Sequence, residues 1–172
     1  MNTTIAERQK KDNDALWLAR CVWTETKDSA EMVYVAWAIR NRVDTKYRGD
    51  SYEKVVLSPW QFSAFNTNYR GRNANMTRTR ASAESMWMQA LDIAKTVVNA
   101  PVEDNAFAPF TTSPSTVRHY FSPQSMTNGP NMLKLAKTHN YGYLYAPVWY
   151  DTKLEVKTPV TGAHFRFFKG IK

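Results

Sequence analysis

Apolar residues recur at helical spacing in the first hundred residues of the chain. A first helix is predicted after the possible caps at residues 12–14, because apolar side chains follow there three and four positions apart. Its apolar positions include Ala15, Leu16, Ala19, Val22 and Trp23. Residues 32–39 are apolar or aromatic throughout, which predicts a buried helix. Asp28 and Glu31 before it have the spacing of a capping box.

Three further segments follow before residue 100. Ser51 is expected to cap a short helix over 52–57, which Ser58-Pro59 would end. Residues 60–65 alternate between aromatic and polar, a pattern typical of an edge strand in which one face packs. Residues 66–80 are predicted to form a long exposed loop. A clear amphipathic helix comes next, with apolar positions at Ala83, Met86, Trp87, Ala90, Leu91, Ala94, Val97 and Val98.

The pattern changes from Pro101 onward, where prolines divide the chain into short pieces. Residues 118–123 are the most strand-like piece, and residues 131–138 are predicted to form a short helix. Aromatic clusters occupy 141–145 and 165–168. The expected fold is therefore mainly α (α+β), with a helical first half and with short strands and long loops in the C-terminal half. We expect one catalytic domain over 1–172, with a flexible N-terminal tail over 1–12.

Composition limits the chemistry that the chain can carry. Its 172 residues, of which 43% are hydrophobic, suffice for one domain with a real core. Cys21 is the only cysteine, so an intrachain disulfide and C-x-x-C metal sites are excluded, and we expect its side chain in the core. His119, His139 and His164 are too far apart for the paired ligands of a zinc peptidase. We expect neither a metal nor a cofactor.

Charge indicates the kind of partner. Twenty-three Lys and Arg against 15 Asp and Glu give a formal charge of +8, which suits nucleic acid, an anionic envelope polymer or a carboxylate-bearing glycan. Four arginines of the 66–80 loop are either ordinary solvated charges or a rim that holds an anionic polymer. They are Arg70, Arg72, Arg78 and Arg80. No apolar run is long enough to span a membrane, and the N-terminus lacks a signal-peptide core, so we expect cytoplasmic synthesis.

Glu25 is the strongest candidate for a catalytic residue. It lies near the end of the first predicted helix and borders its apolar stripe, four residues after Cys21. Partial loss of water there should raise the pKa of its carboxyl, as a general acid requires. The alternative is an ordinary surface glutamate at a helix end.

Five segments of the chain together resemble the bacterial cell wall hydrolase family, which includes spore-cortex-lytic enzymes and phage relatives. They are Glu25, Tyr-Val-Ala-Trp-Ala-Ile-Arg-Asn-Arg-Val (34–43), Val-Val-Leu-Ser-Pro-Trp-Gln-Phe-Ser (55–63), Arg-His-Tyr-Phe-Ser-Pro (118–123) and Gly-Ala-His-Phe (162–165). The resemblance implies a lysozyme-like, mainly helical fold that cleaves the glycan backbone of peptidoglycan, with Glu25 as the catalytic acid. The chain departs from the family at Asp28 and Ser29, which replace a glycine and a second glutamate.

The missing second glutamate favours a lytic transglycosylase, which needs one acid, over a hydrolase with two carboxylates. We expect Gln61, Ser63, His119 and Tyr120 to line the cleft, with ordinary packing and turn roles as the alternative.

Other functions remain open at this point. They are a hydrolytic muramidase, a non-catalytic wall-binding component, or a nucleic-acid-binding protein suggested by the charge of +8. The preferred hypothesis is a monomeric phage lysin or virion-associated enzyme that acts on peptidoglycan glycan strands, without specific nucleic acid. Such an enzyme would reach the wall through a holin-type pore or as part of a phage particle.

Overall fold

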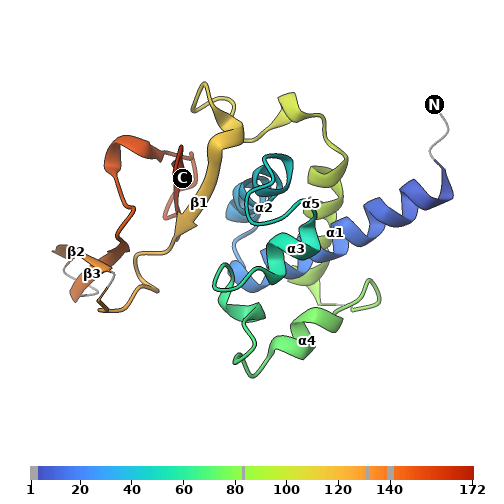
Figure 1. Ribbon diagram of the computed structural model, residues 1–172, viewed down its shortest axis with the longest axis horizontal. Coiled ribbons are helices and arrows are strands. Elements are labelled where there is room, and N and C mark those ends of the chain that lie inside the picture. Colours follow the sequence, from blue (N-terminus) through green and yellow to red (C-terminus); the bar gives the residue numbers. More distant parts are fainter. Residues whose placement is uncertain (1–3, 83, 131, 139–141) are drawn as a thin grey trace. The chain divides into compact units, whose positions relative to one another are not determined.

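The computed structural model describes residues 4–82, 84–130, 132–138 and 142–172 and divides the chain into two compact units, 1–106 and 107–172. Each unit is described here by itself. The first is helical, with a bundle of helices labelled in Figure 1. Its α-helices are α1 (Ile5–Glu25), α2 (Ser29–Asp44), α3 (Tyr52–Leu57), α4 (Arg72–Thr77) and α5 (Ser85–Asn99), joined by the short 3-10 helices η1 (Ser63–Phe65) and η2 (Val102–Asp104). The predicted mainly helical α+β fold is confirmed.

Helix α1 begins earlier than the sequence pattern suggested. Thr4 is its N-cap and forms a capping box with Glu7, so the helix starts at Ile5. Within the tail expected over 1–12, residues 5–12 are therefore helical, while residues 1–3 lie outside the described part. The first turns of α1 are exposed and project away from the other helices (Figure 1), and burial starts at Asp14.

The core of the first unit lies where α1 packs against α5, α2 and α3. Burying a large apolar side chain contributes about 1.5–3 kcal/mol each, so this packing dominates the stability of the unit. Cys21 is fully buried, as expected. The other fully buried side chains include Leu18, Val22, Met32, Ile39, Val55, Trp87 and Leu91.

Two predicted caps are confirmed. The Asp28 carboxylate accepts a hydrogen bond from the Ala30 backbone N–H at the start of α2, and the Ser51 hydroxyl accepts one from the Lys54 backbone N–H in α3. The capping box expected for Asp28 and Glu31 is not formed, because Asp28 bonds to Ala30 and the Glu31 carboxylate accepts from the Thr26 hydroxyl instead. Helix α5 also forms where the apolar pattern predicted it, although Ala83 lies outside the described residues.

The segment between α3 and α5 differs from its prediction. Residues 60–65 form a turn followed by η1 rather than an edge strand, because the Gln61 amide bonds to the Ser58 carbonyl and closes the chain locally. The 66–80 loop contains α4. Its residues are tied back to the preceding segment, since Arg72 Nε donates to the Phe65 carbonyl and Asn75 Nδ2 donates to the Ala64 carbonyl.

The second unit contains two small antiparallel sheets. The first has the strand order β1 (Val117–Phe121), β5 (Arg166–Lys169) and β4 (Glu155–Val156). The second pairs β2 (Met132–Thr138) with β3 (Gly142–Pro147). The 3-10 helices η3 (Pro114–Thr116) and η4 (Thr152–Leu154) complete the unit.

Residues 131–138 were expected to be helical, and for 132–138 this prediction was wrong. Met132 pairs with Pro147 and Lys134 with Tyr145 across the sheet, so pairing with a distant segment overrides the local helical pattern. Asn131, His139 and Tyr141 lie outside the described residues. The strand predicted over 118–123 is confirmed for β1.

Aromatic rings form the core of the second unit. Phe121 stacks on Phe168 with ring centroids 5.5 Å apart, and Trp149 and Tyr150 pack edge-on against both rings. Beside them Arg166 binds Glu155 through two hydrogen bonds of 2.9 and 2.5 Å. These bonds hold the pKa of the Glu155 carboxyl below its ordinary value. No helix in the described ranges is long and apolar enough to cross a membrane.

Candidate active site

Glu25 is the last residue of α1 and is half-buried, as the sequence predicted for its position. Only residues 26–28 connect it to α2, and hydrogen bonds fix this connection. The Thr26 hydroxyl donates to Glu31 Oε2 at 3.3 Å and accepts from the Asp28 amide at 3.0 Å. Because Asp28 caps α2 in turn, the backbone that carries Glu25 is held from both helices.

Trp23, two residues before Glu25, contacts two cationic side chains. The Lys27 ammonium lies 3.7 Å from the Trp23 ring centroid and donates to the Trp23 carbonyl, while the Arg78 guanidinium lies 3.8 Å from the same centroid. Burial lowers the pKa of Lys27; Glu84 opposes this shift and Arg78 adds to it. The turn of α1 before Glu25 therefore contacts two cationic side chains through Trp23.

Cys21 lies one helical turn before Glu25. Burial raises the pKa of its thiol well above the ordinary value, the negative charge of Glu25 raises it further, and the charge of Arg42 lowers it. The charges of Glu25 and Arg42 therefore shift the pKa of the same buried thiol in opposite directions.

Arg42 links this region to Gln61. The Arg42 side chain is almost fully buried, its Nη1 donates to Gln61 Oε1 at 3.2 Å, and its guanidinium lies 5.0 Å from the Phe62 ring centroid. Gln61 is half-buried, and Ser63 is exposed at the start of η1. The structure thus joins Gln61 to Arg42, and Ser63 follows two residues later on the surface.

Arg42 was missing from the predicted site residues. The sequence signal was the polar run Arg40-Asn41-Arg42 at the end of an apolar helix, but its members have different roles. Arg40 Nη1 donates to the Val97 and Ala100 carbonyls and so caps the end of α5. Asn41 Oδ1 accepts a hydrogen bond of 2.8 Å from the side-chain nitrogen Nδ2 of Asn105. Sequence alone does not separate these tasks.

His119 and Tyr120 belong to the second unit, where both lie on β1. His119 packs edge-on against Trp149 with centroids 5.3 Å apart, and Tyr120 packs against Phe165 at 5.1 Å. Successive residues of a strand point to opposite faces, so these two side chains face opposite sides of the sheet. Their expected roles in substrate binding stay predictions.

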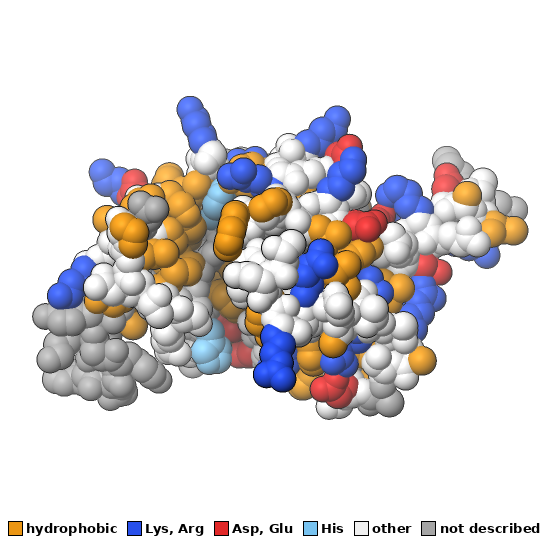
Figure 2. All heavy atoms as spheres, turned by 60° about the horizontal axis from the view of Figure 1, so that its bottom comes forward, with side chains coloured by type: hydrophobic (Ala, Val, Ile, Leu, Met, Phe, Trp, Pro, Cys, Tyr) orange, Lys and Arg blue, Asp and Glu red, His pale blue; other side chains and the backbone are white. Residues whose placement is uncertain are grey.

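The arginines of the 66–80 segment mostly serve the fold. Arg72 binds the Phe65 carbonyl, Arg78 pairs with Glu84 and packs on Trp23, and Arg80 pairs with Asp12 at 2.7 Å. Arg70 is exposed. On the face drawn in Figure 2, Lys and Arg side chains are spread in small groups with Asp and Glu between them.

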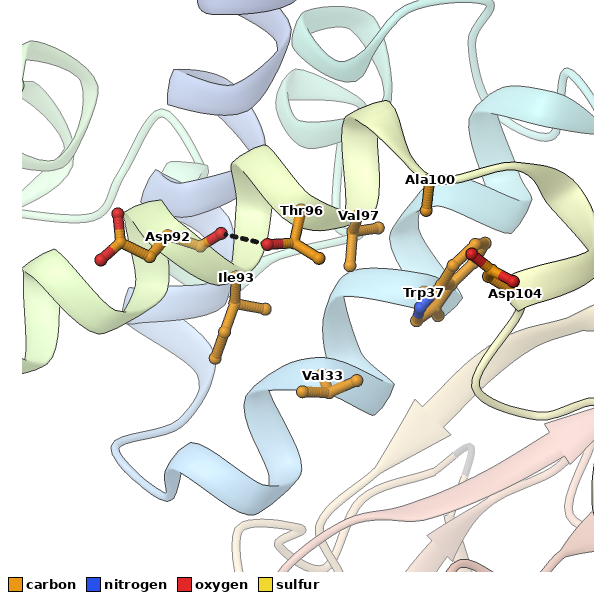
Figure 3. Close-up of a pocket in the computed structure, with 8 residues that line it drawn as sticks. All are labelled: Val33, Trp37, Asp92, Ile93, Thr96, Val97, Ala100 and Asp104. Carbon is orange, nitrogen blue, oxygen red and sulfur yellow. Dashed lines mark hydrogen bonds between the residues drawn. The ribbon is translucent and has the colours of Figure 1, made fainter.

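A separate hollow of about 300 Å³ lies between α2 and the C-terminal half of α5. Figure 3 shows its apolar side chains, with Asp92 and Asp104 at opposite ends of the labelled set. It is lined by Val33, Trp37, Asp92, Ile93, Thr96, Val97, Ala100 and Asp104. None of the predicted site residues lines this hollow.

Comparison with known proteins places the chain in a family. A family model described as cell wall hydrolase matches residues 26–165, which is most of the chain and begins at the residue after Glu25. Searches of curated proteins and of solved structures found no match. The family match covers the connection after Glu25, helix α2 with Arg42 in its last turn, and the turn that contains Gln61. This chain belongs to the cell wall hydrolase family.

Proposed function

We propose that this member of a peptidoglycan-degrading family cleaves the glycosidic bond between N-acetylmuramoyl and N-acetylglucosamine residues, as a lytic transglycosylase with Glu25 as its acid. The observation that carries the proposal is the placement of Glu25. It is half-buried at the end of α1, on a connection that the Thr26 and Asp28 hydrogen bonds fix. A positioned, partly desolvated carboxyl is what general acid catalysis uses.

The neighbouring carboxylates support a mechanism with a single acid. Asp28 is used as the N-cap of α2, and Glu31 is 0% exposed and accepts from the Thr26 hydroxyl. A hydrolase needs a second carboxylate that reaches the sugar or a water molecule opposite the acid. In this conformation a fully buried Glu31 cannot reach a sugar, and Asp28 is committed to the helix.

The proposed reaction uses Glu25 twice. Its protonated carboxyl gives the proton to the glycosidic oxygen as the bond from that oxygen to C1 of the muramoyl sugar breaks. The resulting carboxylate then takes the proton of the C6 hydroxyl of the same sugar, and the C6 oxygen bonds to C1. The products are a new hydroxyl on the leaving sugar and a 1,6-anhydro-muramoyl end, and no water is consumed.

The other predicted residues receive proposed roles in binding. Arg42 holds Gln61 in place, and Gln61 and Ser63 are proposed to bind the polar groups of the glycan. His119 and Tyr120 are proposed to bind the glycan from β1. Because their side chains face opposite sides of the sheet, a glycan strand that lies on one side would contact only one of them. The route to the wall, through a pore or within a phage particle, stays a prediction.

The test is a pair of isosteric substitutions. Glu25→Gln keeps the shape of the side chain and removes its proton, so release of soluble fragments from purified sacculi should fall by about a hundred- to ten-thousand-fold. Glu103→Gln, at an exposed glutamate of η2, serves as the matched control and should leave the rate unchanged. Circular dichroism and melting curves check that both variants fold. A Glu25→Gln rate above about a tenth of wild type would exclude Glu25 as the acid.

A further inference from the structure

Trp60 is exposed where its neighbours are buried. Its side chain is 79% exposed, whereas Phe62 and Phe65 in the same segment are 2% and 3% exposed. Scattered exposed apolar residues are common on proteins, so exposure by itself indicates no function. The backbone of Trp60 supplies a second observation.

Trp60 has a left-handed backbone conformation, with φ at +62°. Bulky residues rarely adopt this region, because the Cβ atom crowds the following carbonyl group. Two hydrogen bonds from backbone N–H groups hold it there. The Trp60 N–H donates to Asn66 Oδ1 at 3.1 Å, and the backbone N–H of Gln61 donates to the Ser58 carbonyl at 3.2 Å. The chain thus adopts an unfavourable conformation that places a large apolar ring in water. Strain of this kind concentrates at functional sites.

Asn66 also positions a second exposed ring. The Tyr69 amide donates to the Asn66 carbonyl at 3.0 Å, and the Tyr69 side chain is 47% exposed. Its ring lies against Gly71, where an added Cβ would come within 2.8 Å of Tyr69 Cε1. One asparagine therefore holds the backbone of both aromatic residues, and the glycine leaves room for the second ring.

Each exposed ring belongs to a residue that directly precedes a polar residue in the sequence. Trp60 directly precedes Gln61, which Arg42 holds, and Tyr69 directly precedes the exposed Arg70. Exposed aromatic faces flanked by amide and guanidinium donors suit a ligand that has both apolar faces and polar edges. A sugar ring fits this description, because its C–H groups form the faces and its hydroxyl and acetamido groups form the edges.

We propose that Trp60 and Tyr69 form an aromatic platform on which N-acetylhexosamine rings of the glycan strand stack, beside the bond that is cleaved. This inference rests on the proposed function and extends it from the catalytic acid to the binding of the polymer. Packing within the fold does not account for the position of the Trp60 ring, since this ring is 79% exposed and its backbone is held in an unfavourable conformation.

The first experiment measures binding in the Glu25→Gln background, in which the ligand stays intact. Oligomers of N-acetylglucosamine are titrated by calorimetry into this protein and into versions that also carry Trp60→Gly, Trp60→Phe or Tyr69→Ala. Loss of either ring should weaken binding about three- to tenfold, as for other aromatic stacking contacts, and Trp60→Phe should restore most of the affinity. Equal affinity in all four proteins would overturn the platform.

A melting curve separates a binding role from a structural one. Glycine adopts positive φ without strain, so Trp60→Gly should melt at the same temperature as the parent or higher while binding more weakly. Lys46→Gly is the matched control, because Lys46 is also exposed and has φ at +55°; it should change melting in the same direction and leave binding unchanged. If Trp60→Gly instead melts well below the parent, the ring is structural and the proposal is wrong.

The same variants in the active protein separate this proposal from the proposed function. Trp60→Gly should raise KM for purified peptidoglycan and change kcat much less. If wild type cleaves the glycan and Trp60→Gly matches its KM, the platform fails and the proposed function stands. If wild type releases no glycan product, the proposed function fails, and the calorimetric titration then decides the platform by itself.

Discussion

Two tryptophans of the helical unit are used in opposite ways. The Trp23 ring contacts the Lys27 ammonium and the Arg78 guanidinium. Arg78 also lies 5.6 Å from the ring centroid of Trp87, whose indole N–H donates to the Thr79 carbonyl. Trp60, by contrast, is held in a left-handed conformation with its ring in water. In the first arrangement the ring contacts side chains of the fold itself, close to the end of α1 that carries Glu25. The second leaves an apolar face available to a ligand.

The difference shows how to distinguish structural aromatic residues from functional ones in this chain. Around Trp23 and Trp87 the contacts are made within the fold, so removing the Trp87 ring or the Arg78 guanidinium should lower the free energy of unfolding. Around Trp60 the fold supplies hydrogen bonds to the backbone only, so removing the ring should affect binding and leave stability intact. Three substitutions test this contrast, from the largest effect to the smallest.

Trp87→Ala should be the most destabilising change. Trp87 is fully buried and its indole N–H is hydrogen-bonded, so the substitution leaves a large cavity and should cost about 3–5 kcal/mol in the free energy of unfolding. Denaturant titration measures the loss. Trp60→Ala, the same change at the exposed ring, should stay within about 0.5 kcal/mol of wild type. Similar losses in both variants would remove the contrast.

Arg78→Met should have an intermediate effect. The substitution keeps much of the packing volume but loses the contact with the Trp23 ring and the pairing with Glu84, at a cost of about 1–2 kcal/mol. Arg70→Met, at an exposed arginine of the same segment, is the control and should change stability by less than about 0.5 kcal/mol. An Arg78 variant as stable as this control would show that the stacked arginine contributes nothing measurable.

Lys27→Met should have the smallest effect. Burial lowers the pKa of Lys27, so the folded protein holds this proton less tightly than the unfolded chain does. The charge of Lys27 therefore opposes folding, and stability rises as the pH rises from the lowered pKa toward the ordinary lysine value. Lys27→Met should stay within about 0.5 kcal/mol of wild type at neutral pH and flatten this rise. Unfolding curves at a series of alkaline pH values check the slope; a steeper rise in the variant would contradict the sign.

Local rules predicted the helical unit well. Asp28 and Ser51 cap their helices as expected, and the apolar positions of α5 face the core. These features were predictable because caps and helical spacing depend on residues that are near one another in sequence. The capping box of Thr4 and Glu7 was also present in the sequence and would have placed the start of α1 at Ile5.

The remaining features depend on partners far along the chain. Residues 132–138 form a strand only because 142–147 pair with them, and no local pattern contains that information. The position of Glu25 at a helix end was predictable, whereas the Arg42–Gln61 hydrogen bond joins residues 19 apart and was not. Trp60 illustrates the same limit. The alternation of 60–65 predicted that its ring packs on one face of a strand, but the turn from Ser58 to Gln61 leaves the ring exposed to solvent.

The central claim is that Glu25 alone drives lytic transglycosylation, and the most direct test is mass spectrometry of the fragments released from purified peptidoglycan. Because the cell wall hydrolase family also includes amidases, the products must distinguish glycan cleavage from amide cleavage. We predict 1,6-anhydro-muramoyl ends with intact peptide stems from wild type and no such ends from Glu25→Gln. Reducing muramic acid ends as the main product would show hydrolysis, and glycan strands freed of their stems would show an amidase; either result would contradict the claim.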